Sequence, residues 1–489
     1  MKQTSPFKTA LLALLLLGPG ACAKKEQLVI FATGRTQGRL WAREEPALKN
    51  KRAGGFAVFK RLYDQETLPK LALDAGNWFT VTPEGWLTKG HSTMDCLNAV
   101  PYDAAAVGLE DLSLAPADLG KLAAASRLPL LASNLYLKNN KKPDFLRSSV
   151  ILRAGRRKVG VFSAMISSPD RPNRAKYLTN YKLEKETYET EKAVKALRDG
   201  GAEVIVMLLG VNPKEKAGAE FFREFLAKGP RIDLVITDEP SIRKPFKTGR
   251  TWVAGAGLEA VSAARLVLDL EPANGRLKAV HWKDLPLLQE KYGQDQGLLK
   301  IIAGHRKAAS AHFSKRVGFL KEPLPKDDGG YSPMADFAAD CIRRWARTNA
   351  AIISLKEPAT GFSSGTVTVG DLYAAFPLDS SVVFVKIRGD DLERALAAVP
   401  PSEIAVSGLK LFLKDGAFER AESETGPLVP GRTYRLAVPD SFVGGKNNPV
   451  LSSAMEFANS RRYLREVIGW CFSRQSSFSR PGGTRIVRN

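Results

Sequence analysis

The residues that most often bind metals or act as nucleophiles are sparse in this chain. Its 489 residues include four cysteines and four histidines. None of them stands in a CxxC pair, a CxxCH haem-attachment site or an HExxH helix. The sequence therefore excludes the usual zinc, haem and dithiol frameworks.

The histidines are spread through segments of different kinds. His305 and His312 lie seven residues apart in the basic stretch QGLLKIIAGHRKAASAHFSKR, and this spacing is more typical of a solvated helix face than of a metal site. His91, in KGHSTMD, precedes a helical pattern, and we interpret it as a hydrogen-bonded residue at the start of that helix.

Two cysteines of the C-terminal third invite a disulfide. Cys341 and Cys471 both lie in helical patterns and would leave Cys96 buried and free if they paired. The alternative is three buried thiols, and the sequence leaves the choice open.

An alternation of strands and helices must position these side chains. Short apolar runs such as QLVIF, KLALD, KVGVFSA, EVIVMLL and IDLVIT alternate with amphipathic helical segments, as in a layered α/β domain with buried strands. KEPLPKDDGG, rich in proline, glycine and charge, marks a boundary further on. We expect an α/β domain at 22–284, a helical linker at 285–316 and an α+β domain at 317–489.

The composition is that of a globular protein with a large basic excess. Hydrophobic residues make up 44% and charged residues 25%, which excludes disordered and fibrous classes. Lys and Arg number 73 against 51 Asp and Glu, a net charge of +22. No nucleic-acid motif accounts for this excess, and we expect no nucleic-acid partner.

The N-terminal residues have the pattern of an export signal. MKQTSPFKTALLALLLLGPGAC has two lysines and an apolar run far shorter than the roughly 20 residues that span a bilayer, which predicts a signal peptide at 1–21. Its end resembles a bacterial lipobox, with Pro19 in place of the usual Leu. This predicts lipidation of Cys22 and a membrane-anchored lipoprotein facing the periplasm or cell surface. Ordinary signal-peptidase cleavage near Ala21 or Ala23 is the alternative.

The order of segments resembles the secreted bacterial 5′-nucleotidase family. LVIFATGRTQGRL stands where that family has a strand followed by T-N-D-x-H-G-R, LALDAGNWF where it has L-D-x-G-D, and YDAAAVGLEDL where it has Y-D-A-x-x-x-G-N-H-E. GTVTVGDLYAAFPLDSSVVFVKIRGDDLERAL matches the family's C-terminal signature. The resemblance implies a four-layer α/β/β/α metallophosphoesterase sandwich, a linker helix and an α+β nucleotide-binding domain.

The family's chemistry uses two divalent metals that activate a water, and each aligned ligand is replaced here. The first Asp and the next His fall on Arg35 and Gln37, and the bridging Asp falls on Asn77. The Asn and His of G-N-H-E fall on Leu109 and Glu110, and the three later histidines on Gly210, Glu239 and Ser241.

Arg35 is the decisive replacement. Arginine is a permanent cation, and the oxygen set left by Gln37, Asn77, Glu110 and Glu239 is sparse. We therefore expect loss of two-metal catalysis, no metal cofactor, and a binding or assembly role in the cell envelope. One alternative is a hydrolase of nucleotides or other phosphate esters with altered chemistry, in which a carboxylate is the base and Arg35 clamps the anion. Another is a purely structural lipoprotein with no small ligand.

The nucleotide-binding stretches of the C-terminal domain are altered as well. The family's N-x-G-G-x-R aligns with SLKEPA, and G-G-D-G with GGKN. Phe362 and Phe442 stand where the family sandwiches a nucleobase, so a nucleoside or small anionic ligand remains a prediction, with core packing as the alternative.

The basic excess gathers near the end of the chain. Seven arginines face one acid, Glu466, from residue 461 onward. For a lipid-anchored protein the expected partner of this surface is the anionic membrane.

Overall fold

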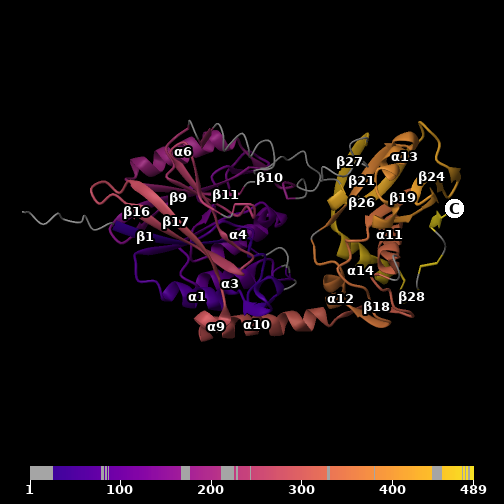
Figure 1. Cartoon of the computed structure of the whole chain (residues 1–489), viewed down its shortest axis with the longest axis horizontal. Coiled ribbons are helices and arrows are strands. Elements are labelled where there is room, and N and C mark those ends of the chain that lie inside the picture. Colours follow the sequence, from indigo (N-terminus) through magenta and orange to yellow (C-terminus); the bar gives the residue numbers. More distant parts are fainter. Residues whose placement is uncertain are drawn as a thin grey trace, which may run out of the picture.

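A computed structural model describes most of the chain. The described residues are 26–78, 82, 85, 87–166, 177–210, 225–226, 229–242, 244–327, 331–378, 380–442, 454–475, 477–479, 481–482 and 485–488. Cys22 and the predicted signal peptide lie outside them. The described chain forms two α/β domains that follow one another along the long axis and are joined by a helix (Figure 1).

The N-terminal domain is built on two β-sheets. The first has the order β17-β16-β1-β4-β5-β6, with β15 beside β1, and the second has the order β13-β14-β12-β11-β9-β8. The first contains β1 (Glu26–Gly34), β4 (Lys70–Asp74), β5 (Ala104–Ala106), β6 (Leu130–Leu131), β15 (Gly257–Leu258), β16 (Ser262–Leu270) and β17 (Leu277–Pro286). The second contains β8 (Ser149–Ala154), β9 (Arg157–Met165), β11 (Val204–Gly210), β12 (Leu234–Thr237), β13 (Phe246–Thr248) and β14 (Thr251–Gly255).

The two sheets pack face to face, and helices cover their outer faces. Alternate apolar residues of both sheets, such as Ile30, Leu73, Val206 and Leu266, form the core between them. The first sheet is covered by α1 (Phe56–Asp64), α3 (His91–Ala99) and α4 (Pro116–Ala125), and the second by α6 (Glu186–Asp199). The result is the predicted four-layer α/β/β/α sandwich.

Parallel strand order sets where the loops meet. β1, β4, β5 and β6 run parallel, as do β9, β11, β12 and β14. Their carboxyl ends therefore meet at one edge of the sandwich and their amino ends at the opposite edge. The five predicted site residues of this domain, Arg35, Gln37, Asn77, Glu110 and Glu239, all follow carboxyl ends.

The linker is shorter than the predicted 285–316. β17 continues to Pro286, the short α9 (Gln289–Tyr292) follows, and α10 (Gln296–Phe313) is the connecting helix. Asp295 caps α10 by accepting a hydrogen bond from the backbone N–H of Leu298. Leu298 and Ile302 are buried in the N-terminal core, and α10 also contacts the C-terminal domain at α12 (Val369–Ala375).

The C-terminal domain has a central sheet of order β22-β19-β26-β21-β27. These strands are β19 (Ala350–Ser354), β21 (Ser381–Arg388), β22 (Ile404–Ser407), β26 (Thr433–Pro439) and β27 (Glu456–Tyr463). One face packs on α11 (Pro333–Ala346) and α14 (Leu464–Arg474), and the other on α13 (Gly389–Ala397). Two smaller sheets complete the domain. One consists of β18 (Arg316–Leu320), β20 (Gly365–Thr368) and β28 (Ser477–Phe478). The other consists of β23 (Leu409–Lys414), β24 (Ala417–Ser423), β25 (Gly426–Pro427) and β29 (Ile486–Arg488).

The structure contains the disulfide that was one of the two alternatives for the cysteines. Cys341 on α11 is bonded to Cys471 on α14, with 5.8 Å between their Cα atoms, and Cys96 is buried and free. Burial raises the pKa of the Cys96 thiol to about 12, which makes it unreactive.

Within the described part of the chain, no helix is both long enough and apolar enough to cross a bilayer.

Candidate functional site

The five predicted site residues meet at the carboxyl edge of the N-terminal sandwich. Arg35 and Gln37 follow β1, Asn77 follows β4, Glu110 begins the 3-10 turn after β5, and Glu239 follows β12. Backbone hydrogen bonds tie the first two loops together, from Arg35 N–H to the carbonyl of Gly76 at 2.8 Å and from Gln37 N–H to that of Asn77 at 3.0 Å.

An ion pair occupies the centre of this edge. Arg35 Nε lies 3.2 Å from Asp238 Oδ2, and Asn77 Nδ2 donates to the same oxygen at 2.7 Å. The Asp238 side chain is 2% exposed, whereas that of Arg35 is 32% exposed. The pair therefore has a buried carboxylate and a guanidinium that reaches solvent.

Glu110 and Gln37 connect to this pair through Asn77, and Glu239 acts on Arg35 through its charge. Asn77 Oδ1 accepts a hydrogen bond from the backbone N–H of Glu110 at 2.9 Å, and the Glu110 carboxylate accepts one from Gln37 Nε2 at 3.3 Å. Glu239 is buried and accepts a hydrogen bond from the backbone N–H of Ser241 at 3.1 Å. Both ends of the Asn77 amide are thus engaged within the protein.

The charges of this cluster act on one another. Burial alone would lower the pKa of Arg35, but Asp238, Glu110 and Glu239 together raise it above its ordinary value. Burial raises the pKa of Asp238, while Arg35 and Asn77 oppose that shift. Arg35 is consequently a fixed cation whose charge is stabilised by three acidic neighbours.

The backbone of the site is tightly constrained. Arg35, Gln37 and Asn77 have φ values of 49°, 50° and 63°, in the left-handed region. Gly108 lies against Asn77, and a Cβ atom at Gly108 would stand 2.3 Å from Asn77 Oδ1. The glycine of the G-x-E segment is therefore required by the side chain that holds Asp238.

Three acidic residues of the site were not predicted as site members. Asp238 is the first of them, and the two successive acids after the buried strand IDLVIT were the signal available for it in the sequence. Asp111 accepts hydrogen bonds from the backbone N–H groups of Asn77, Trp78 and Gly108 at 2.8–2.9 Å, and burial raises its pKa to about 8.

Asp74 is a framework residue, as its position at a strand end suggests. It accepts hydrogen bonds from Thr33 Oγ1 at 2.6 Å and from the backbone N–H of Gly76 at 2.8 Å. Burial raises its pKa to about 6. It thereby fixes the turn that leads into Asn77.

This donor set does not fit a two-metal centre. Arg35 occupies the position of a ligand with a cation, the Asn77 amide is used up, and Leu109 and Gly210 supply no side-chain donor. Among the described residues no group of three His, Cys, Asp or Glu side chains has an arrangement that could hold a metal ion. His305 instead contacts Asp95 Oδ2 at 3.0 Å, which links α10 to α3.

The two phenylalanines of the C-terminal domain are both buried. Phe362 belongs to the cluster around α11 and α14, and Phe442 to the cluster on the opposite face of the sheet. This packing favours core roles. Residues 443–453, which include the GGKN stretch, lie outside the described residues.

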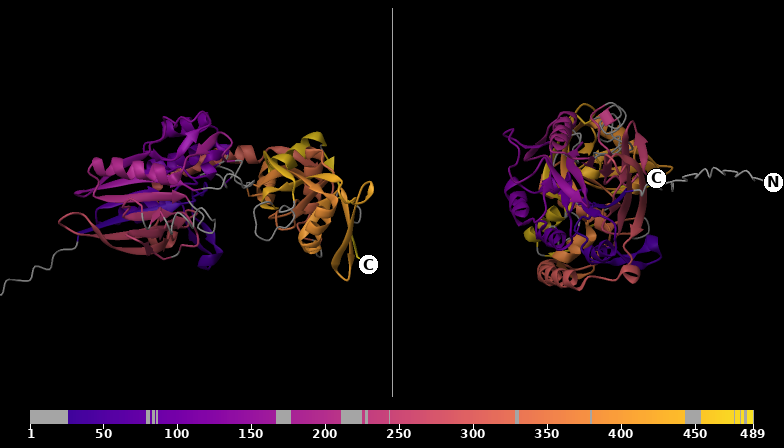
Figure 2. Two further views of the ribbon diagram at one scale, coloured as in Figure 1. Left: turned by 90° about the horizontal axis from the view of Figure 1, so that it is seen from above. Right: turned by 90° about the vertical axis from the view of Figure 1, so that its left-hand side faces the viewer.

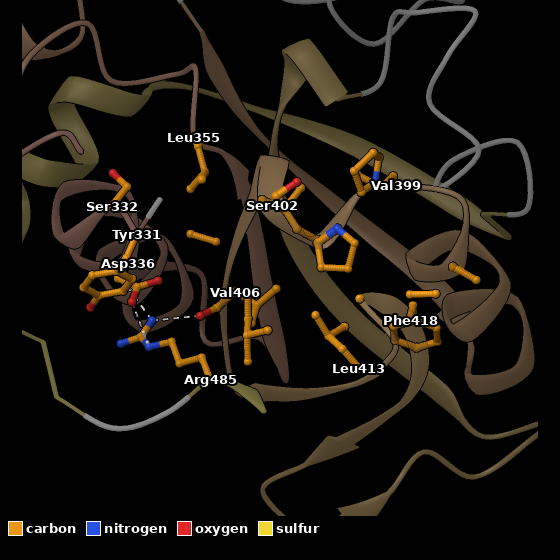
Figure 3. Close-up of a pocket in the computed structure, with 18 of the residues that line it drawn as sticks. Tyr331, Ser332, Asp336, Leu355, Val399, Ser402, Val406, Leu413, Phe418 and Arg485 are labelled. Carbon is orange, nitrogen blue, oxygen red and sulfur yellow. Dashed lines mark hydrogen bonds and ion pairs between the residues drawn. The ribbon is translucent and has the colours of Figure 1, made fainter. Parts of the chain in front are cut away.

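A cavity of about 890 Å³ opens elsewhere in the C-terminal domain (Figure 3). Its wall is largely apolar, including Leu355, Val406, Leu413 and Phe418. Arg485 closes one end, with Nη2 2.7 Å from Asp340 Oδ2 and Nη1 2.8 Å from the carbonyl of Val406. None of the predicted site residues lines it.

The sandwich, the connecting helix and the second domain define a class: a calcineurin-like phosphoesterase fold followed by a 5′-nucleotidase C-terminal domain. Residues 315–453 match the family "5'-nucleotidase, C-terminal domain". Protein UshA of Yersinia enterocolitica is 20% identical over 452 residues, covering 81% of this chain and 82% of that protein.

Solved structures share the whole architecture. The 5′-nucleotidase precursor of Thermus thermophilus aligns with a TM-score of 0.64 at 18% identity, covering 94% of this chain and 99% of that one. A putative 5′-nucleotidase of Staphylococcus aureus gives 0.73 at 13% identity with the same coverage. The chain thus shares the fold of these 5′-nucleotidases in both domains, as its motifs predicted.

Proposed function

We propose that this protein is an exported, lipid-anchored relative of the 5′-nucleotidases that has lost two-metal phosphoesterase activity and acts as a binding or assembly protein in the cell envelope. The observation that carries this proposal is the Arg35–Asp238 ion pair, braced by Asn77, at the edge where the family binds metal.

Electrostatics explains why this pair argues against a metal. A divalent ion beside Asp238 would have to displace a guanidinium that is charged at every accessible pH. It would also lie within a few ångströms of that cation, where repulsion is strong because the surroundings are partly buried. Hard cations take six or more oxygens, and here the nearest amide oxygen is already an acceptor for Glu110.

Export is supported by three features. The N-terminal segment has the pattern of a signal with a lipobox-like end at Cys22. Cys341 and Cys471 form a disulfide, which is typical of oxidising compartments. A structural relative, the 5′-nucleotidase precursor of Thermus thermophilus, bears the name of a precursor, which agrees with synthesis as a longer form.

The test is an assay of the mature chain against 5′-AMP and a phosphodiester with added Mn²⁺, Mg²⁺, Zn²⁺ or Co²⁺. We expect no turnover above a protein-free blank and no rise in melting temperature with metal. Robust turnover that is abolished by Asn77→Ala and retained by the surface variant Asn98→Ala would overturn the proposal. A parallel thermal-shift screen with nucleosides and nucleotides tests the binding role.

The second candidate is a hydrolase with altered chemistry. Its support is that Glu110, Glu239 and a partly exposed Arg35 lie in one cluster, as a general base and an anion clamp would require. Activity in EDTA that is lost in both Glu110→Gln and Arg35→Gln would favour this candidate, whereas unchanged activity in either variant would exclude it.

A further inference from the structure

We infer that the protein docks on a bilayer of anionic phospholipid through the amino edge of its N-terminal sandwich. The basic end face, as we name it, consists of five exposed side chains: Arg156, Arg231, Lys247, Arg250 and Arg276. The inference rests on the proposed lipid anchor at Cys22 and adds to it a defined surface and orientation.

The anchor position selects this edge. Cys22 precedes Glu26, the first residue of β1, by four residues, and a chain of that length spans at most about 14 Å. Glu26 is held in place by Arg156 Nε at 2.9 Å and Arg157 Nε at 2.8 Å. Acyl chains on Cys22 would therefore bring the bilayer to the edge that carries Arg156.

The charge of this edge matches an anionic surface. The hairpin at 153–158 carries four basic residues and no acid, and the turn at 247–250, before β14, carries two basic residues and no acid. Arg231, Lys247, Arg250 and Arg276 border a surface hollow of about 470 Å³. Basic groups near such a membrane are attracted by its negative surface potential.

The local acids offset part of this charge, because Glu26 pairs with Arg156 and Asp233 pairs with Arg231. Asp233 is buried, and its carboxylate is taken up by Arg198 Nη2 at 2.8 Å and Arg231 Nε at 3.1 Å. Lys247 Nζ lies 4.7 Å from the ring centre of Trp252, which gives this part of the face an aromatic side chain beside a cation. Such pairs suit the boundary between headgroups and acyl chains.

Strand direction fixes the orientation that follows. The parallel strands begin at the basic end face, so Arg35 and Asp238, which follow carboxyl ends, lie at the opposite edge. The C-terminal domain lies at the other end of the long axis from the start of β1 (Figures 1 and 2). Docking would hold the C-terminal domain away from the bilayer.

This geometry separates the basic end face from the arginine-rich tail. The arginines from 461 onward belong to the distal domain, and two of them are committed internally. Arg465 is buried and donates to the carbonyl of Leu378, and Arg485 pairs with Asp340. The tail is therefore the poorer candidate for the membrane surface.

The experiment measures lysine accessibility on the acylated mature protein in vesicles. Vesicles of phosphatidylcholine with phosphatidylglycerol are compared with vesicles of phosphatidylcholine alone, using an amine-reactive label and mass spectrometry. We expect labelling of Lys247 and of Lys278, an exposed lysine at the start of β17 on the same edge, to fall about threefold or more on the anionic vesicles. Labelling of Lys356 and Lys386, exposed in the C-terminal domain, should stay unchanged. Equal labelling on both vesicle types, or protection of the distal lysines instead, would overturn the inference.

Matched charge reversals provide the control. Lys247→Glu, Arg250→Glu and Arg276→Glu combined should abolish the protection of Lys278, whereas Arg461→Glu, Arg462→Glu and Arg474→Glu combined should leave it intact. The opposite result would assign docking to the tail and overturn the inference. Mass spectrometry of Cys22 distinguishes the two proposals. Absence of acyl groups on Cys22 would exclude the lipid anchor. Binding of the unacylated chain to anionic vesicles through Lys247, Arg250 and Arg276 would still support the basic end face.

Discussion

Arg35 and Asp238 stand 203 residues apart in the chain and share an ion pair at 3.2 Å. The pair joins the loop after β1 of one sheet to the loop after β12 of the other. It therefore clamps the two sheets of the sandwich at their carboxyl edge. The position where the resemblance to the 5′-nucleotidases places a metal ligand therefore carries, in Arg35, a contact between the two sheets.

Removal of the cation should destabilise the protein. Arg35→Gln leaves the Asp238 carboxylate buried with Asn77 as its remaining described donor, and we expect a loss of about 1–3 kcal/mol in the free energy of unfolding. This range is below that of a fully buried pair because the Arg35 side chain is 32% exposed. Urea denaturation at pH 7 measures it.

A double-mutant cycle with Asp238→Asn isolates the interaction. The second substitution should recover part of the loss, because it removes the uncompensated charge. Arg39→Gln is the matched control in the same loop, since its partners Glu259 at 3.1 Å and Glu45 at 3.6 Å are more exposed than Asp238, and Arg39 should contribute less than about 1 kcal/mol. Equal effects of Arg35→Gln and Arg39→Gln would contradict the clamp.

Gly108 gives an independent test of the same site. Gly108→Ala would place a Cβ atom 2.3 Å from Asn77 Oδ1 and 2.5 Å from Asn77 N, so the loop that holds Asp238 must move. We expect a destabilisation of about 1–3 kcal/mol by thermal or chemical unfolding.

The control for this substitution is another glycine. Gly304→Ala lies inside α10 with no atom within 4 Å of the added Cβ, and it should stabilise by about 0.5–1 kcal/mol. If both variants shifted stability in the same direction, packing against Asn77 would not be the cause.

The fold and most of the candidate site were accessible from the sequence, for identifiable reasons. Buried strands such as KVGVFSA reveal themselves through uninterrupted apolar runs, and residues that follow parallel strands must meet at one edge. Arg35, Gln37, Asn77, Glu110 and Glu239 were assigned to one site by the resemblance to the 5′-nucleotidase motifs, and the structure places them after strand ends.

The features that the sequence could not predict depend on tertiary contacts. Asp238 is a partner of Arg35 only because the two sheets pack against each other. The start of the linker helix was placed too early, because the half-exposed end of β17 lacks the apolar run of a buried strand. The pairing of Cys341 with Cys471 depends on α11 packing against α14, which no local pattern encodes.

The disulfide should stabilise the C-terminal domain. It closes a loop with a sequence separation of 130, and its reduction is expected to cost about 2–4 kcal/mol. Thermal unfolding with and without a reductant measures this, and Cys341→Ala with Cys471→Ala should unfold at the same lower temperature in both conditions. Cys96→Ala should keep the full dependence on reductant, because Cys96 takes no part in the bond.

Glu26 should make stability depend on acid pH. Hydrogen bonds from Arg156 and Arg157 lower the pKa of Glu26 from about 4.5 to about 2 in the folded state. A depressed folded pKa contributes stability that is complete above the unfolded value, near pH 4.5, and is lost as the pH falls towards 2.

Glu26→Gln should therefore be less stable than the parent protein by about 1–3 kcal/mol at pH 7, and this difference should shrink steadily between pH 4.5 and pH 2. Urea titrations at several pH values measure the difference. Glu290→Gln removes an exposed pair with Lys51 and should show little difference at any pH. Because Arg157 is nearly buried, a pH-independent difference for Glu26→Gln would mean that shape and packing, rather than the carboxylate charge, hold the start of β1 against β9.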